Sequence, residues 1–138
     1  MQHALNNLSD QAHTLRQSRR SHIDELRTFT EHLPRDDKML IEQVLDGQLP
    51  MTQLARLYRQ PARQLQRRAQ SIIKRLSDKH FRFVALQMNT LPPEVRNTAR
   101  HVILHGRSMR KAAEISGQSL HMVRQNMNTV RATARLFI

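Results

Sequence analysis

The 138-residue sequence contains no cysteine and no tryptophan. The lack of cysteine excludes a disulfide framework, a thiolate zinc site and a thiol nucleophile. No apolar run approaches the roughly 20 residues that a membrane-spanning helix requires. Residues 1–10 show neither the apolar segment nor the cleavage pattern of a signal peptide. We therefore expect a soluble, cytoplasmic protein with no membrane partner.

Acidic residues are few, and the charge is unevenly placed. Lys and Arg number 23 against 11 Asp and Glu, which gives a formal net charge of +12. Residues 1–32 are neutral overall, whereas residues 33–76 carry +5 and residues 77–138 carry +7. Basic blocks of this kind favour an anionic partner, above all a nucleic acid. The alternative is that the charge only keeps the protein in solution.

Glycine and proline are also scarce, at three and five residues. Helix-forming residues dominate, and Val and Ile are scattered without alternation, so we predict an all-α fold. Proline is favoured in the first turn of a helix and glycine just after its end, so these residues mark the boundaries. The expected helices span about 4–31, 35–46, 51–58, 61–77, 80–88, 93–105, 109–116 and 119–136.

The sequence contains an internal repeat. A Leu-Pro pair opens each copy, and the spacing from Ala55 to Leu65 equals that from Ala113 to Val123. The period of about 58 residues is longer than that of the usual solenoid repeats, so we predict two copies of a trihelical unit. The expected organisation is an N-terminal helical arm (1–32), a first unit (33–79), a connecting helix (80–90) and a second unit (91–138).

The N-terminal arm has a different, seven-residue period. Its two series, broken near the middle by polar residues, are Leu5, Ala12, Arg19, Leu26 and Leu33, and Leu8, Leu15, His22 and Phe29. One interpretation is a dimerising helix pair, which would make the protein a homodimer. The other is an ordinary amphipathic helix that packs on the basic blocks.

Each unit ends in two short helices with a tight turn between them. In the second unit, Ala113, Gly117 and Val123 have the spacing of a helix-turn-helix (HTH) motif. The small residue lets the helices approach, glycine takes a positive φ in the turn, and the apolar residue closes the core. Ser119 follows the turn as a suitable N-cap.

The first unit is an imperfect copy of this motif. Arg59 stands where the second unit has Gly117, and Pro61 stands in place of Ser119. A residue with a Cβ costs energy in a left-handed turn, so we expect this turn to be looser or differently shaped.

The pattern of the second unit extends over about 46 residues, in the segments Leu91-Pro92-Pro93-Glu94-Val95-Arg96, Gly106-Arg107-Ser108, Ala112-Ala113-Glu114, Ser116-Gly117-Gln118-Ser119, Val123-Arg124-Gln125 and Val130-Arg131-Ala132. It resembles region four, the promoter-reading HTH, of bacterial sigma factors. The first unit resembles the same region more weakly. Trihelical repressors of plasmids and adhesin operons share much of the pattern.

The resemblance implies that the residues just after the cap read DNA. At these positions Arg124 and Gln125 match the family, whereas Leu120 and His121 stand where it has a charged pair. Nothing in the chain corresponds to the region with which a sigma factor binds the core polymerase and melts DNA. We therefore do not expect a complete sigma factor.

Helical periodicity separates core positions from DNA-facing positions on the two candidate recognition helices. On the first, the apolar stripe is Leu65, Ala69, Ile72 and Leu76, and the opposite face holds Arg63, Arg67, Gln70 and Lys74, flanked by Arg59, Arg68 and Arg75. On the second, the stripe is Val123, Met127, Val130 and Ala134, opposed by His121, Gln125 and Asn128, with Arg124, Arg131 and Arg135 to one side.

The candidate DNA-binding residues are Arg59, Arg63, Gln66, Arg67, Gln70, Lys74, Arg107, Ser119, His121, Arg124, Gln125, Asn128 and Arg131. The first face is mostly guanidinium, which suits phosphates and guanine edges, whereas Gln and Asn on the second pair with adenine. We therefore expect more affinity from the first unit and more selectivity from the second. The alternative is two solvated helix faces, which usually mix charge signs.

No set of residues predicts catalysis or metal binding. His101 and His105 are spaced i, i+4, but the sequence offers no third ligand and no HExxH pattern. Asp36 and Asp37 suit the first turn of a helix, where acids complement the helix dipole. No nucleophile, base and orienting group converge, so we expect no enzyme, no metal and no cofactor.

Together these features predict a nucleoid-associated transcription regulator that binds double-stranded DNA through tandem HTH units. Its recognition helices would enter successive major grooves, about 34 Å apart. The alternative is a sigma-like adaptor that binds RNA polymerase and uses DNA only as support. An RNA-binding role is disfavoured because the sequence lacks an aromatic platform.

Overall fold

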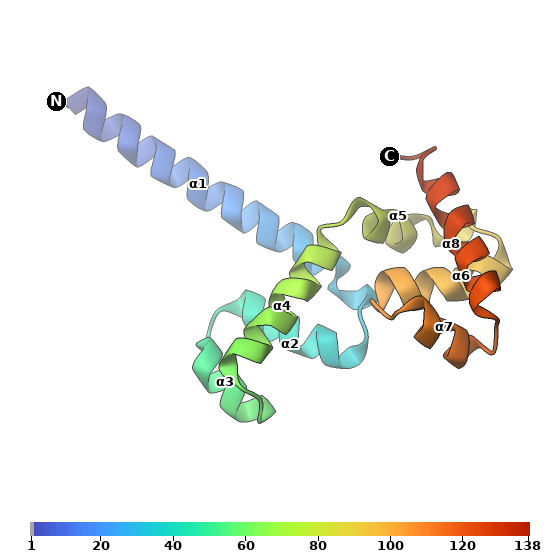
Figure 1. The fold of residues 1–138 in the computed structure, drawn as a ribbon. Coiled ribbons are helices and arrows are strands. Elements are labelled where there is room, and N and C mark those ends of the chain that lie inside the picture. The colour runs from blue at the N-terminus through green and yellow to red at the C-terminus, as the bar shows by residue number, and fades with distance from the viewer. Residues whose placement is uncertain (1) are drawn as a thin grey trace.

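The computed structural model describes residues 2–138, with side chains from Asp10 onward. Every regular element in this range is helical, as the all-α prediction requires (Figure 1). The elements are α1 (Gln2–Phe29), η1 (Thr30–His32), α2 (Arg35–Asp46), α3 (Met51–Tyr58), α4 (Ala62–Leu76), α5 (Lys79–Gln87), η2 (Met88–Thr90), α6 (Pro93–Ala99), η3 (Arg100–Leu104), α7 (Met109–Ser116) and α8 (Leu120–Ala134). Within residues 2–138, none of these helices has both the length and the apolar character needed to span a bilayer.

The helices repeat with a constant offset of 58 residues. Helix α3 begins at residue 51 and α7 at residue 109, and each has eight residues. Helix α4 begins at residue 62 and α8 at residue 120, and each has 15 residues. Helix α2 runs from 35 to 46, and α6 with η3 runs from 93 to 104. We call α2–α4 the first trio, and α6–α8 with η3 the second trio.

The repeat also includes the helix that precedes each trio. The short turns η1 and η2 begin at residues 30 and 88, again 58 residues apart. Helix α5 therefore precedes the second trio in the same way that the C-terminal end of α1 precedes the first. The segment that the sequence suggests as a connector is thus the counterpart of the end of the arm.

The apolar stripes of α4 and α8 are buried, as their periodicity predicts. All eight stripe residues are at most 2% exposed. One core continues from Leu26 of α1 through Leu76 of α4 and Phe81 of α5 to Val130 of α8. Both trios contribute to this core, and the second trio has an additional small cluster of Ala112, Ala113 and Val123.

The turns between the last two helices of each trio have the same form. Gly117 has φ +69°, and the Gln118 N–H donates to the Ala113 carbonyl oxygen at 3.1 Å. Arg59 has φ +52°. The Gln60 N–H donates to the Ala55 carbonyl oxygen of α3 at 3.1 Å, which is the equivalent hydrogen bond. The prediction of a looser or different first turn is therefore wrong. Packing imposes the left-handed conformation on arginine, at a cost of about 1–2 kcal/mol.

The first helices of the two trios end differently. In η3 the His105 N–H donates to the Arg100 carbonyl oxygen at 2.9 Å, which is a π-helical turn. Such a turn accommodates one extra residue within a helix. Gly47 follows α2 directly, and the position 58 residues later is His105. Gly106 therefore stands one position later in the second trio than Gly47 does in the first.

Arg75 joins the two trios. Its Nη2 donates to Asp37 Oδ2 at 3.0 Å in the first trio, and its Nη1 donates to the His105 carbonyl oxygen at 3.2 Å in the second. Arg68 Nη2 donates to Asp37 Oδ1, also at 3.0 Å. A Cβ atom on Gly106 would lie 1.6 Å from Arg75 Nη1, so only glycine leaves room for the guanidinium.

Helix α1 projects away from the rest of the molecule (Figure 1). Its C-terminal end packs on the other helices: Leu26 and Phe29 are buried, and Arg82 of α5 lies 5.2 Å from the centre of the Phe29 ring. Residues 10–22 are exposed except for Ala12, so the interpretation as a helix packed on the basic blocks fails for this stretch. Pairing with a second copy stays a prediction, and the side chains of Leu5 and Leu8 lie outside the described residues.

Candidate nucleic-acid interface

Helix α4 presents a basic face to solvent. The predicted residues of this region are all exposed, namely Arg59, Arg63, Gln66, Arg67, Gln70 and Lys74. In the part of the chain whose side chains are described, no carboxylate lies within 4.0 Å of these cations. The face therefore keeps its full positive charge, as a phosphate-binding surface does.

Two further cations of α4 do not belong to this face. Arg68 and Arg75, expected to flank it, point instead toward α2 and share the carboxylate of Asp37. Asp37 lies in the first turn of α2, where it also complements the helix dipole. Its side chain is 19% exposed, so the ion pairs lie mostly out of water. The sequence predicts only the dipole role of Asp37, because its two arginine partners lie 31 and 38 residues away.

Helix α8 presents the second face. The predicted residues His121, Arg124, Gln125, Asn128 and Arg131 are all exposed. The predicted cap is confirmed, since Ser119 Oγ accepts the Met122 N–H at 3.1 Å. The Ser119 hydroxyl thereby fixes the first turn of α8, which carries the residues next to the cap.

Polar contacts hold the opposite side of each of these helices. On α8, the Asn126 Nδ2 donates to Thr98 Oγ1 of α6 at 3.0 Å, and Asn126 is only 5% exposed. The position 58 residues earlier on α4 is Arg68, which pairs with Asp37 of α2. Both helices are thus tied to the first helix of their trio at the same point. The sequence gives no local signal for this role of Asn126, because Thr98 lies 28 residues away.

Exposed apolar side chains next to the two faces are not among the residues predicted from the sequence. Met122, in the first turn of α8, is 44% exposed. Leu57 of α3 and Ile115 of α7 are 66% and 46% exposed, and they occupy equivalent positions in the repeat. Apolar side chains beside a basic face can contact the methyl group of thymine.

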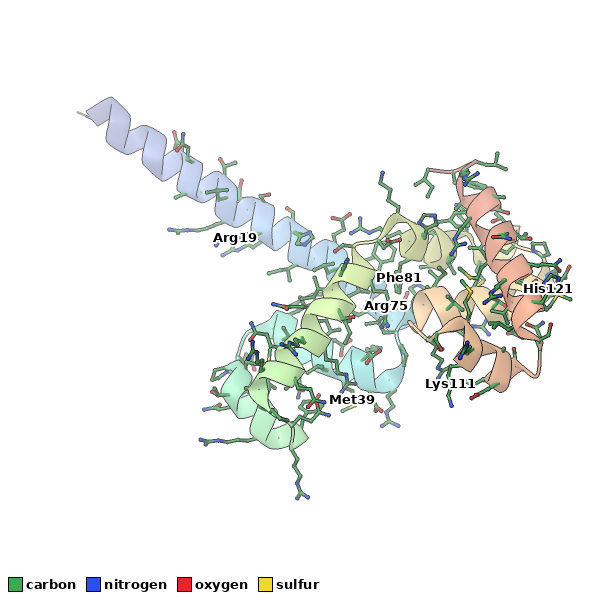
Figure 2. All side chains as sticks on the ribbon, viewed as in Figure 1. Arg19, Met39, Arg75, Phe81, Lys111 and His121 are labelled. Atoms are coloured by element: carbon green, nitrogen blue, oxygen red, sulfur yellow. The ribbon has the colours of Figure 1, made fainter. Side chains whose placement is uncertain are left out.

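The N-terminal ends of α4 and α8 lie far apart (Figure 1), whereas residues nearer their C-terminal ends line one cavity. The N-terminal ends of α4 and α8 lie at the lower left and lower right of Figure 1. Farther along the helices, Lys74 and Arg131 line the same cavity. Figure 2 shows Arg75 between the two trios and His121 on the outer side of α8.

Arg107 lies apart from the α8 face. It is half-buried, and its guanidinium donates to Nδ1 of His101. The rings of His101 and His105 lie edge to face, with centroids 5.8 Å apart. Burial lowers the pKa of both histidines, and the positive charge of Arg107 lowers each pKa further. Both effects favour the neutral form of the two imidazoles. No group of three metal-ligating side chains occurs in the described part of the chain.

Comparisons with protein-family models, with curated proteins and with solved structures find no match for the chain.

Proposed function

We propose that the chain is a duplex-DNA-binding transcription regulator, with α4 and α8 as the recognition helices of tandem HTH units. One observation carries this proposal. The same helical trio occurs twice, and the third helix of each exposes a face of cations and amides. Neither α4 nor α8 contains an acidic residue. Faces that serve only for solubility usually mix the two charge signs.

The two helices divide the task of recognition. The exposed guanidinium groups of α4 contact phosphates and guanine edges, and therefore supply most of the affinity. The exposed Gln125 and Asn128 of α8 pair with adenine and supply most of the selectivity. The divergent N-terminal ends of the two helices enter successive major grooves on one side of the duplex.

Fluorescence anisotropy with a labelled random-sequence duplex pool, titrated at several salt concentrations, tests the proposal. The exposed cations of the two faces are Arg59, Arg63, Arg67, Lys74, Arg124 and Arg131. If all of them contact phosphates, the logarithm of the affinity should fall with the logarithm of the salt concentration with a slope of about −5. A second round of selection from the same pool then identifies the preferred sequence.

A charge-matched pair of variants locates the contact. The double substitution Arg63→Gln/Arg67→Gln should make the salt slope shallower by about 2. The control Arg16→Gln/Arg20→Gln removes the same charge from the exposed part of α1 and should leave the slope unchanged. Absence of DNA binding even at low salt would overturn the proposal. Retention of RNA polymerase in a pull-down after nuclease treatment would then identify the chain as a sigma-like adaptor.

A further inference from the structure

A cavity of about 460 Å³ opens between the two trios, where α4, α5, η3 and α8 meet. Its volume falls within the range of roughly 300–1,000 Å³ that is typical of small-molecule sites. Sites of this kind are mainly apolar and contain a few polar groups that orient the ligand.

The interior of the cavity is apolar. Phe81 of α5, Met127 of α8 and Val102 and Ile103 of η3 form the apolar part of the lining. Phe81 and Met127 are only 1% and 2% exposed, so the accessible apolar surface belongs mainly to the partly buried Val102 and Ile103. The ligand that suits this surface has an apolar body.

Positive charge dominates the rest of the lining. Lys74, Arg75 and Arg131 line the cavity from α4 and α8, against one carboxylate, that of Asp78. The Asp78 Oδ1 accepts the His80 N–H at 2.7 Å as the N-cap of α5 and keeps its negative charge, so three cations face one anion. Lys74 and Arg131 have no carboxylate within 4.0 Å among the described residues. The charge therefore complements an anionic group.

The third cation is fixed in advance. Arg75 donates to Asp37 and to the His105 carbonyl oxygen, and its Nε is buried without a hydrogen-bond partner. A side chain that is already ordered loses little conformational entropy when a ligand binds. Because the same guanidinium joins the two trios, the cavity lies at the point that sets their relative position.

We propose that this cavity binds a small organic anion. The apolar body of the ligand packs mainly on Val102 and Ile103, and its single carboxylate, sulfonate or phosphate group faces Lys74 and Arg131. Binding links α4 to α8 across the junction, which is the contact between the two trios at Arg75.

Two fluorescent probes that differ in one group test the site directly. The first, 8-anilinonaphthalene-1-sulfonate, has an aromatic body and one anionic group. The second, N-phenyl-1-naphthylamine, has the same body without the sulfonate. The full chain should bind the sulfonate with a stoichiometry of one, and about tenfold more tightly than the neutral amine, because ionic hydrogen bonds add to the apolar contact.

Substitutions then separate the cavity from the general charge of the protein. Lys74→Gln/Arg131→Gln should weaken binding of the sulfonate about tenfold, while Arg56→Gln/Lys111→Gln, which removes the same charge at exposed positions outside the cavity, should leave it unchanged. Ser71→Trp places an indole at the exposed edge of the cavity and should block both probes. Circular dichroism spectra of all variants should match that of the parent.

Three results would overturn the assignment. The first is sulfonate binding that survives Lys74→Gln/Arg131→Gln in a folded protein. The second is equal affinity for the two probes, which would leave an apolar cavity without anion preference. The third is inorganic phosphate that displaces the sulfonate at similar concentration, because the cavity would then be a contact for a DNA phosphate.

An effect on DNA binding follows only if the proposed function holds. Lys74 and Arg131 belong to the two DNA-facing surfaces, so a bound anion competes with phosphates for both side chains. Saturating sulfonate should then weaken binding to the duplex pool about tenfold and should have no effect on the Ser71→Trp variant. Probe binding without DNA binding would refute the proposed function alone, and DNA binding without probe binding would refute the cavity site alone.

Discussion

Substitution of one glycine should reveal how strongly the two trios are joined. Gly106 and Gly117 have nearly the same φ, +66° and +69°. A Cβ on Gly117 meets nothing within 4 Å, whereas a Cβ on Gly106 lies 1.6 Å from Arg75 Nη1. The two glycine-to-alanine variants therefore share the backbone strain and differ only in the collision with the guanidinium.

The expected costs follow from these contacts. Alanine in the left-handed region destabilises the fold by about 1 kcal/mol, which is the whole effect expected for Gly117→Ala. In Gly106→Ala the guanidinium must also leave the His105 carbonyl oxygen and shift from Asp37. Hydrogen bonds of charged groups contribute about 1.5–3 kcal/mol each, and the side chain of Arg75 is 21% exposed, so we add about 2 kcal/mol. Gly106→Ala should therefore cost about 3 kcal/mol.

Urea unfolding followed by circular dichroism measures both costs. A double-mutant cycle with Arg75→Met isolates the contact: without the guanidinium, Gly106→Ala should cost only the backbone strain, so the coupling energy should be about 2 kcal/mol. Equal costs for Gly106→Ala and Gly117→Ala would refute the reasoning. So would a Gly106→Ala cost that stays the same in the Arg75→Met background.

Three further predictions concern pH and DNA. Burial and Arg107 lower the pKa of His105, so its stabilising effect is present above the unfolded pKa of about 6.5 and is lost as the pH falls below that value. Urea unfolding at pH 7 and pH 5 should show a smaller loss for His105→Gln than for the parent chain, and equal losses would contradict this. If the chain binds DNA as proposed, Arg67→Ala should weaken binding to all sequences alike. Gln125→Ala should instead reduce discrimination at one base pair, by about 1–3 kcal/mol. If both variants lose affinity equally for all sequences, the division of roles between α4 and α8 is wrong. Insertion of half a helical turn, about 5 base pairs, between the two half-sites should lower affinity to that of one half-site, and gel-shift titration showing unchanged affinity would mean that the two trios move independently.

The positions of the helices could be predicted because the signals that set them are local. Proline, serine and glycine stand at the ends of the helices, and each acts through its own backbone or its nearest neighbours. Both apolar stripes could likewise be read from spacing alone. The exposed residues of the two candidate faces followed from the stripes, because they lie on the opposite side of the same helices.

The features that escaped prediction depend on contacts between distant parts of the chain. Asp37 meets Arg68 and Arg75, which lie 31 and 38 residues away, and nothing next to Asp37 in the sequence indicates this. The turn at Arg59 looked unfavourable by local rules, yet packing gives it the same form as the turn at Gly117. The exposed stretch of α1 was hidden for the same reason, because only the rest of the fold shows what a helix fails to contact.

The two trios share a fold but differ in the contacts that stabilise it, so the two copies are not equivalent. Arg75 of α4 reaches across the junction to the second trio, whereas its counterpart on α8, Thr133, donates to the Thr129 carbonyl oxygen of its own helix at 2.8 Å. The charged link therefore runs one way, from the first trio to the second. Gly106 also makes room for this link, because a Cβ there would collide with the Arg75 guanidinium, whereas a Cβ on Gly47 or Gly117 meets nothing within 4 Å. The two trios are therefore not interchangeable, although they are related by a repeat. Their spacing depends on contacts that both trios supply.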